Sequence, residues 1–177
     1  MRKVISTLIV LGAVVAGCSE EEAAKKRAGA TILAKGGSML AGTVTFVEDG
    51  EGVLAVVQVT NAPPGEHGVH VHAGMSCADD PDAGAMGAAA GALGHYDPDM
   101  TMNHGKPNDD DTHAGDLGNI EVRANGSGTL EVRTDRLQIG SGNNVIGRAI
   151  VIHAMEDDLE TQPSGDSGGR IGCGVIQ

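Results

Sequence analysis

The sequence has almost no aromatic residues: it contains no Trp, one Tyr and one Phe among 177 residues. The apolar interior must therefore be built from Val, Ile, Leu and Ala. Many of these side chains are β-branched, and 28 glycines lie among them, which favours short strands joined by tight turns. A chain of this length has room for one domain and little more. We expect a single all-β domain.

Basic residues are also scarce, with 12 Lys and Arg against 24 Asp and Glu, a formal net charge of −12. The charge becomes −14 if an N-terminal signal that carries Arg2 and Lys3 is removed. A protein with this much negative charge repels nucleic acids and other polyanions, and the sequence has no stripe of basic side chains to offset the repulsion. We therefore expect no nucleic-acid partner.

The apolar run at residues 4–15, which follows a basic start, is too short to span a membrane as a helix. It predicts a secretory signal over residues 1–17. The small residues before Cys18 resemble a bacterial lipobox, in which the cysteine is acylated and anchors the protein to the membrane. Ordinary signal cleavage near Gly17 is the alternative. Ser19 is typical of outer-membrane sorting, towards the periplasm or the cell surface, and residues 18–29 would then be the acylated cysteine and a flexible tether.

Eight short apolar runs cut by turn signals predict eight strands. They cover residues 31–34, 42–47, 53–60, 67–72, 118–123, 128–133, 145–154 and 170–176. The Asn125-Gly126 pair between the fifth and sixth runs is a strong hairpin signal. Two segments without this pattern remain, residues 73–118 and residues 155–169.

Three of the seven histidines fall within residues 67–72. Side chains alternate along a strand, so His70 and His72 project from one face while Val71 points into the core. His67 lies an odd number of residues from both, and we expect it to be structural. The other two form half of a metal site.

The long segment 73–118 lacks apolar periodicity, and such segments inside a domain are usually functional or disordered. A bound metal can replace the missing hydrophobic packing. Four candidate ligands, the number that closes a structural zinc site, lie in it: His95, His104, His113 and Asp116. A second set lies on strands: His70, His72 and His153. His95 could hold one metal at each ring nitrogen, and spacing alone does not separate copper from zinc.

From residue 30 to the C-terminus the chain resembles the Cu/Zn superoxide dismutase family. The matching segments are, in order, residues 65–72, 94–98, 104–107, 113–119, 147–153 and 169–176. One His-x-His pair would be weak evidence, but the order and identity of six segments make the match specific. The resemblance implies an eight-stranded Greek-key β-barrel over residues 30–177, with the metals outside the barrel under two long loops.

The resemblance also implies a role for each residue. The copper ligands would be His70, His72, His95 and His153, and the zinc ligands His95, His104, His113 and Asp116. Asp157 matches an aspartate that ties a copper-ligand histidine to a zinc-ligand histidine and so fixes their ring tautomers. Arg170 matches an arginine that attracts and orients the anion beside copper. Cys77 and Cys173 match the family's disulfide, which suits an oxidising compartment.

The implied activity is a redox cycle that converts superoxide to dioxygen and hydrogen peroxide, with His95 as bridge and proton carrier. One alternative is a copper-binding or copper-storing lipoprotein without turnover, and another is a structural adhesion domain. Retention of His95, Asp157 and Arg170 favours the enzyme, because a store needs neither a bridge nor an anion guide. A homodimer is left open.

Three features depart from the family pattern. Residues 79–91 resemble an insertion whose Ala and Gly content predicts a mobile flap. The second loop is acidic, so capture of an anion would depend on the metals, Arg170 and Lys106. Four methionines near the metal loop could bind Cu(I), but we interpret them as fillers of irregular gaps: Met75, Met86, Met100 and Met102.

Overall fold

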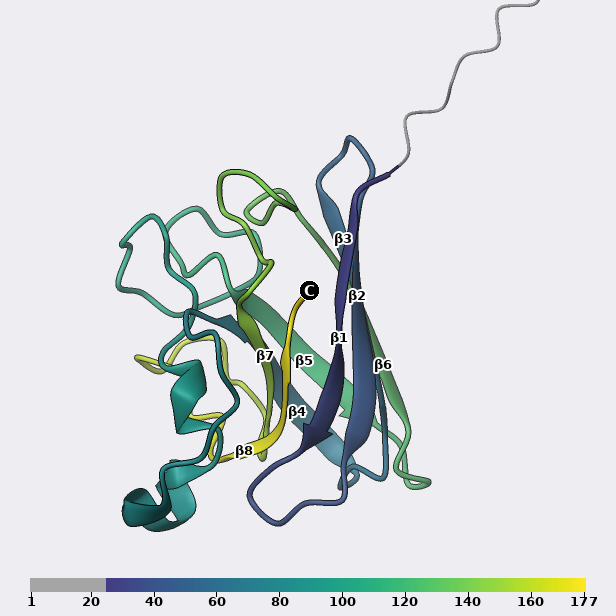
Figure 1. Cartoon of the computed structure of the whole chain (residues 1–177), viewed down its shortest axis with the longest axis vertical. Helices are drawn as coiled ribbons and strands as arrows, with labels where there is room; N and C mark the ends of the chain where they lie inside the picture. The colour runs from purple at the N-terminus through teal and green to yellow at the C-terminus, as the bar shows by residue number, and fades with distance from the viewer. Residues whose placement is uncertain (1–24) are drawn as a thin grey trace, which may run out of the picture.

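The computed structural model describes residues 25–177 and forms a closed barrel of antiparallel strands (Figure 1). The strands are β1 (Arg27–Ala34), β2 (Ala41–Glu48), β3 (Val53–Thr60), β4 (Gly65–His72), β5 (Asp116–Val122), β6 (Gly128–Thr134), β7 (Ala149–His153) and β8 (Arg170–Val175). Around the barrel they lie in the order β1-β2-β3-β6-β5-β4-β7-β8. The chain crosses over other strands between β3 and β4 and again between β6 and β7, so the predicted all-β Greek-key fold is confirmed.

The described part of the chain has no helix with the length and apolarity to cross a bilayer. The predicted signal peptide, residues 1–17, and the predicted acylation site, Cys18, lie outside the described residues. Both stay predictions.

Two strand boundaries differ from the prediction. β1 begins at Arg27, so residues 27–29 of the predicted tether belong to the barrel. The reason is pairing: Arg27 lies opposite Val47 of β2, and Gly29 exchanges two backbone hydrogen bonds with Gln177, each 2.9 Å long. β7 is shorter than predicted because residues 145–148 form a turn.

The barrel core is built from aliphatic side chains, as the scarcity of aromatics requires. In β3 every second residue is buried and points inward: Val53, Ala55, Val57 and Val59. The one phenylalanine, Phe46, is fully buried among them. The alternation in the sequence therefore marks the inward face correctly.

β4 is buried on both faces. Val69 and Val71 belong to the barrel core, while His70 and His72 lie on the outer face, as predicted. The segment between β4 and β5 covers this outer face, beside β4, β7 and β8 (Figure 1). The histidines are therefore held between the barrel wall and a loop, away from bulk water.

The segment predicted to be a flap, residues 79–91, is exposed over residues 79–84 and packs on the barrel through Ala89. It contains two short 3₁₀ turns, η1 (Pro81–Gly87) and η2 (Ala90–Ala92). Ala89 and Ala92 are fully buried in a small cluster with Val151 and Cys173. Because alanine side chains are small, the backbone can approach the barrel closely. A disulfide between Cys77 and Cys173 fastens the start of the segment.

Candidate metal centre

The backbone around Val71 brings distant segments together at the end of β4. The Tyr96 N–H donates to the Val71 carbonyl (2.8 Å), and the Val71 N–H donates to the Gly115 carbonyl (2.8 Å). Residue 115 must be glycine because a Cβ there would lie 2.2 Å from the Val71 carbonyl oxygen. This pairing places His95 and Asp116 beside the two histidines of β4.

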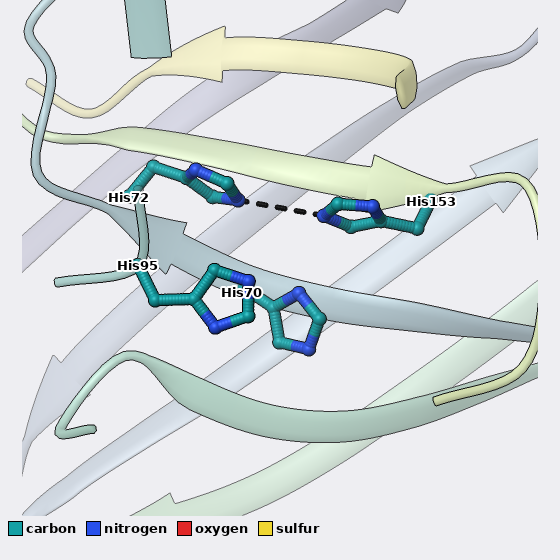
Figure 2. Close-up of side chains that lie close together, drawn as sticks. All are labelled: His70, His72, His95 and His153. Carbon is teal, nitrogen blue, oxygen red and sulfur yellow. Dashed lines mark hydrogen bonds between the residues drawn. The ribbon is translucent and has the colours of Figure 1, made fainter. Parts of the chain in front are cut away.

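Four histidines form the first group, shown in Figure 2, and each offers a ring nitrogen within 4.8 Å of the others: His70, His72, His95 and His153. His72 Nδ1 donates to the Leu93 carbonyl (2.8 Å), and His153 Nδ1 donates to the Gly168 carbonyl (3.1 Å). These bonds leave both Nε2 atoms unprotonated and 3.4 Å apart. The two lone pairs are therefore available to one metal ion.

Two further nitrogens of the first group are buried without a hydrogen-bond partner, His70 Nδ1 and His95 Nε2. His70 Nε2 is 2.7 Å from Asp157 Oδ2, which leaves Nδ1 to face the group. Unpaired polar atoms in a protein interior are costly unless something binds them. The donor chemistry and these unpaired atoms fit an imidazole-preferring metal such as copper.

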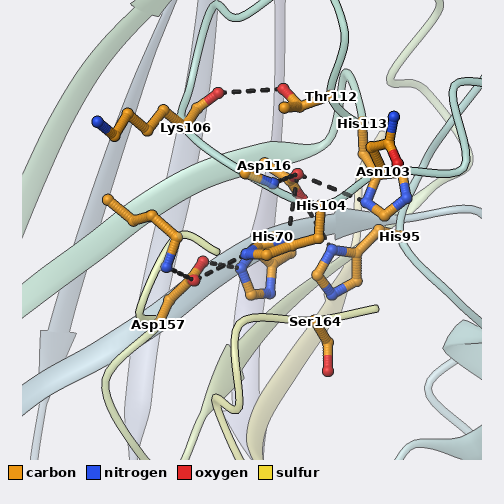
Figure 3. Close-up of polar contacts among 12 residues, drawn as sticks. His70, His95, Asn103, His104, Lys106, Thr112, His113, Asp116, Asp157 and Ser164 are labelled. Carbon is orange, nitrogen blue, oxygen red and sulfur yellow. Dashed lines mark hydrogen bonds and ion pairs between the residues drawn. The ribbon is translucent and has the colours of Figure 1, made fainter. Parts of the chain in front are cut away.

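Asp116 is the centre of the second group (Figure 3). His95 Nδ1 lies 2.7 Å from its Oδ1, and His104 Nδ1 and His113 Nδ1 lie 3.1 and 3.4 Å from its Oδ2. Neither of these last two nitrogens makes a hydrogen bond, although both are buried. Three imidazoles and one carboxylate suit zinc.

The structure brings all seven predicted ligands into two adjoining groups, with one difference in the second. The four side chains whose ligand atoms all lie within 4.8 Å of one another include His70 in place of His113: His70, His95, His104 and Asp116. Asp157 contacts two members of this set: its Oδ1 lies 2.8 Å from His104 Nε2, and its Oδ2 contacts His70 (Figure 3). One carboxylate thus ties the two groups together.

Burial favours the neutral form of three histidines in the first group. It holds the pKa of His72 and of His153 well below the usual value, and neighbouring imidazoles add to the effect. Burial also lowers the pKa of His95 to about 4, with a further contribution from His70. Neutral imidazole is the form that binds metals, so these side chains need lose no proton near pH 7.

The carboxylates give the second group a different charge. Burial acts to lower the pKa of His104, but its contacts with Asp116 and Asp157 raise that pKa to about 9. Burial opposes ionisation of the two aspartates as well, yet the surrounding imidazoles hold both pKa values well below the usual range. Two ionised carboxylates next to imidazole nitrogens favour a bound cation.

His67, predicted to be structural, directs neither ring nitrogen at the metals. Its Nδ1 lies 2.9 Å from the His153 carbonyl and its Nε2 lies 2.8 Å from the Pro63 carbonyl. It joins the entrance of β4 to the end of β7, and the prediction is confirmed.

Three positioning residues were missed by sequence reasoning. Asn119 exchanges two 2.8 Å hydrogen bonds with the backbone of Asp157, and Gln162 binds both the N–H and the carbonyl of His104. Arg136 donates to the Thr112 carbonyl (3.1 Å) and so fastens the loop beside His113. Asn119 lies inside a matching segment and could have been found there, whereas Gln162 and Arg136 carry no local signal.

A cavity of about 620 Å³ opens beside the two groups. Its lining includes these histidine and charged side chains: His72, His95, Asp97, His113, His153 and Arg170. The Arg170 guanidinium donates to the Ala89 carbonyl (2.6 Å) and to the Leu93 carbonyl. Lys106 is not part of the lining, and its side chain leads away from the histidines (Figure 3). Arg170 is thus the cation that lines the cavity.

The interpretation of the methionines as gap fillers is wrong for three of them. Met75, Met100 and Met102 are 72%, 79% and 79% exposed. Met100 and Met102 lie on a loop at φ of 56° and 61°, and Met102 lines the cavity. The side chain of Met86 is not among those that the structure describes.

Residues 40–176 match the family described as copper/zinc superoxide dismutase (SODC). The chain belongs to the copper/zinc superoxide dismutase family. Copper and zinc are the metals of that family, and the two histidine groups fit them.

Individual relatives agree with this assignment. The chain is 38% identical to superoxide dismutase [Cu-Zn] of Deinococcus radiodurans over 173 residues, which cover 96% of this chain and 93% of the relative. It is 41% identical to the Photobacterium leiognathi protein of the same name over 138 residues, 77% of this chain and 78% of that one. The crystal structure of the clock protein EA4 superposes with a TM-score of 0.70 at 31% identity, covering 86% and 94% of the two chains.

Proposed function

We propose that the protein is a superoxide dismutase, which converts superoxide to dioxygen and hydrogen peroxide at a copper ion bridged to zinc by His95. One observation carries this proposal: a single imidazole belongs to both groups. His95 Nδ1 lies 2.7 Å from Asp116, and His95 Nε2 is buried without a partner among the other histidines. A protein that only stored copper would have no need of such an arrangement.

The donor sets assign each metal. Copper would be held by His70, His72, His95 and His153, and zinc by His95, His104, His113 and Asp116. Bound copper supplies the one-electron redox chemistry, while zinc adds positive charge without redox chemistry of its own.

The protein's own residues handle the anion and the proton. Arg170 uses two N–H groups on carbonyls, and its remaining donors can orient a small anion in the cavity. His95 Nε2 is the atom at which a proton can be held for the reduced product, while Nδ1 stays beside Asp116. The formal net charge of −12 repels superoxide at long range, so capture depends on this local positive field.

The test combines metal content with superoxide consumption in protein loaded with both metals. We expect one copper and one zinc per chain and catalytic removal of superoxide. Zinc binding without copper uptake or activity would contradict the enzyme. Copper binding without turnover would support the copper-storing alternative.

A second measurement tests the bridge. If His95 joins the metals, removal of zinc must change the visible absorption spectrum of bound copper, because one copper ligand then loses its second metal. His113→Ala, which alters only the zinc set, should produce the same spectral change. If neither zinc removal nor His113→Ala changes the copper spectrum, His95 does not bridge the two metals.

We also propose that Cys18 carries a lipid anchor that holds the enzyme at an outer membrane, facing the periplasm or the cell surface. The support is the basic start, the short apolar run and the small residues before Cys18 in the sequence. A Cys18→Ser variant should then leave the membrane fraction. If the unaltered protein is found only in the soluble fraction, the anchor is ruled out.

A further inference from the structure

The direction of the Arg170 guanidinium is set by two carbonyls from the segment between Cys77 and His95. Nη1 donates to Ala89 and Nη2 to Leu93. The Leu93 carbonyl also accepts the 2.8 Å hydrogen bond from His72 Nδ1. The backbone of this segment therefore determines where the guanidinium lies relative to His72 of the first group.

Both residues whose carbonyls hold Arg170 have a positive φ, Ala89 and Leu93. Ala89 is the buried one of the two. It is fully buried and has a φ of 49°, in the left-handed region that alanine rarely adopts. A strained conformation persists only where its surroundings hold it. The Ala89 N–H donates to Asp79 Oδ1 (2.8 Å), which fixes the peptide on one side of the residue.

Asp79 is itself tied to the barrel. Its Oδ1 accepts a 3.0 Å hydrogen bond from Lys35 Nζ. The Lys35 backbone N–H in turn donates to the Ile171 carbonyl (2.9 Å), one residue from Arg170. A continuous series of hydrogen bonds therefore runs from the start of β8 through Lys35, Asp79 and Ala89 to the Arg170 guanidinium.

We propose that Asp79 is a positioning residue for Arg170: by holding the Ala89 peptide, it aims the guanidinium at a small anion in the cavity. The inference rests on the proposed role of Arg170 as an anion guide. The proposal and simple electrostatics predict opposite changes in anion affinity when Asp79 is removed. Removing an acid from a negatively charged protein strengthens anion binding, whereas loss of a positioning contact weakens it.

The test is the affinity of the copper-loaded protein for azide, a small anion, followed by the change in visible absorption. Asp79→Ala removes both contacts, and Asp79→Asn keeps an oxygen for the Ala89 N–H. Asp80→Ala is the matched control, because it removes the same charge from the adjacent exposed residue, whose carboxylate caps η1 through the Asp82 N–H. Arg170→Ala serves as the reference for full loss of the guanidinium.

We expect Asp79→Ala to weaken azide binding about threefold to tenfold, Asp79→Asn to stay within twofold of the unaltered protein, and Asp80→Ala to leave the affinity unchanged or slightly higher. The azide-free copper spectrum should be the same in all of them. Unchanged or tighter binding in Asp79→Ala would overturn the proposal. An asparagine variant as weak as alanine, or an altered copper spectrum, would also overturn it.

The same experiment distinguishes failure of this inference from failure of the proposed role of Arg170. If Arg170→Ala binds azide as tightly as the unaltered protein, Arg170 is no anion guide, whatever Asp79 does.

Discussion

At the scale of single residues, Asp157 shows how one carboxylate can serve two metal groups. Its Oδ2 contacts His70 and its Oδ1 contacts His104, while Asn119 holds its backbone from both sides. In the sequence Asp157 stands within a run of three acids and would be read as a solvated charge. Only the match to the family pattern singled it out, and the structure supplies the physical reason.

Asp157→Ala should weaken binding of both metals, because the rings of His70 and His104 lose the contact that fixes their tautomers. Loss of such an outer contact typically costs about 10-fold to 100-fold in metal affinity. Competition with a chromophoric chelator measures the effect for zinc. Glu156→Ala, at an exposed neighbouring acid, should leave the affinity unchanged, and equal losses in the two variants would contradict this role.

Arg170→Ala should lower the rate of superoxide consumption about tenfold or more, because the cavity loses its local positive charge. Added salt should then raise the rate of the variant relative to that of the unaltered protein, since the attraction to the guanidinium is gone and screening acts on the remaining long-range repulsion. Both metals should stay bound, because Arg170 contacts only carbonyls. Stopped-flow rates at several ionic strengths, with metal analysis, test all three expectations.

At the scale of elements, two loops that lack apolar periodicity are held by polar contacts. The loop after β7 folds back so that Gly165 lies against Asp157 and His104. Its φ of 65° suits glycine, and a Cβ there would lie 1.8 Å from Asp157 Oδ1. The loop can therefore reach the metal groups only with glycine at this position.

Gly165→Ala should reduce zinc affinity and stability together, because the added methyl must displace Asp157 or His104. Gly140→Ala is a control, since Gly140 has a φ of 79° and open space around its Cβ position. Both variants carry the conformational cost of alanine at a positive φ, about 1–2 kcal/mol. Thermal unfolding and zinc competition should show a larger loss at residue 165, and equal effects would mean that backbone strain alone is responsible.

At the scale of the whole molecule, the barrel and the metal loops are joined by covalent and metal links as well as by packing. The barrel closes through β1 and β8, and its interior is filled by aliphatic side chains. The long loop contributes little to this core. Its attachment depends on the disulfide, the metals and single polar contacts.

Replacing Cys77 and Cys173 together with serine should lower the free energy of unfolding by about 4 to 5 kcal/mol, the chain-entropy value for a link across roughly 100 residues. The two cysteines are separated by 96 residues. Urea unfolding of the metal-free protein measures the difference without a contribution from metal binding. A loss below about 1 kcal/mol would show that packing alone holds the segment.

Removal of both metals by a chelator should release the loop but not the barrel. Each metal adds about 2.7 kcal/mol of stability when its free concentration is 100 times its dissociation constant. Hydrogen exchange followed by mass spectrometry should show faster exchange in residues 97–113 and little change in β2, β3 and β6. Equal acceleration in these strands would contradict the separation of loop from barrel.

Local patterns in the sequence determined the strands and one half of the site. Alternation of apolar residues marked the inward face of β3, and the same rule placed His70 and His72 on the face opposite Val71. The scarcity of aromatics implied an aliphatic core. These features could be predicted because each depends on neighbours within a few residues.

Tertiary structure alone decided which distant residues meet. It joined Asn119 to Asp157 and Gln162 to His104, and it buried Ala89 and Ala92 against the barrel, at the end of a segment whose composition suggested a flap. It also left Met100 and Met102 exposed. Such contacts follow from closure of the barrel and from backbone hydrogen bonds between segments tens of residues apart, and no periodicity along the chain encodes them.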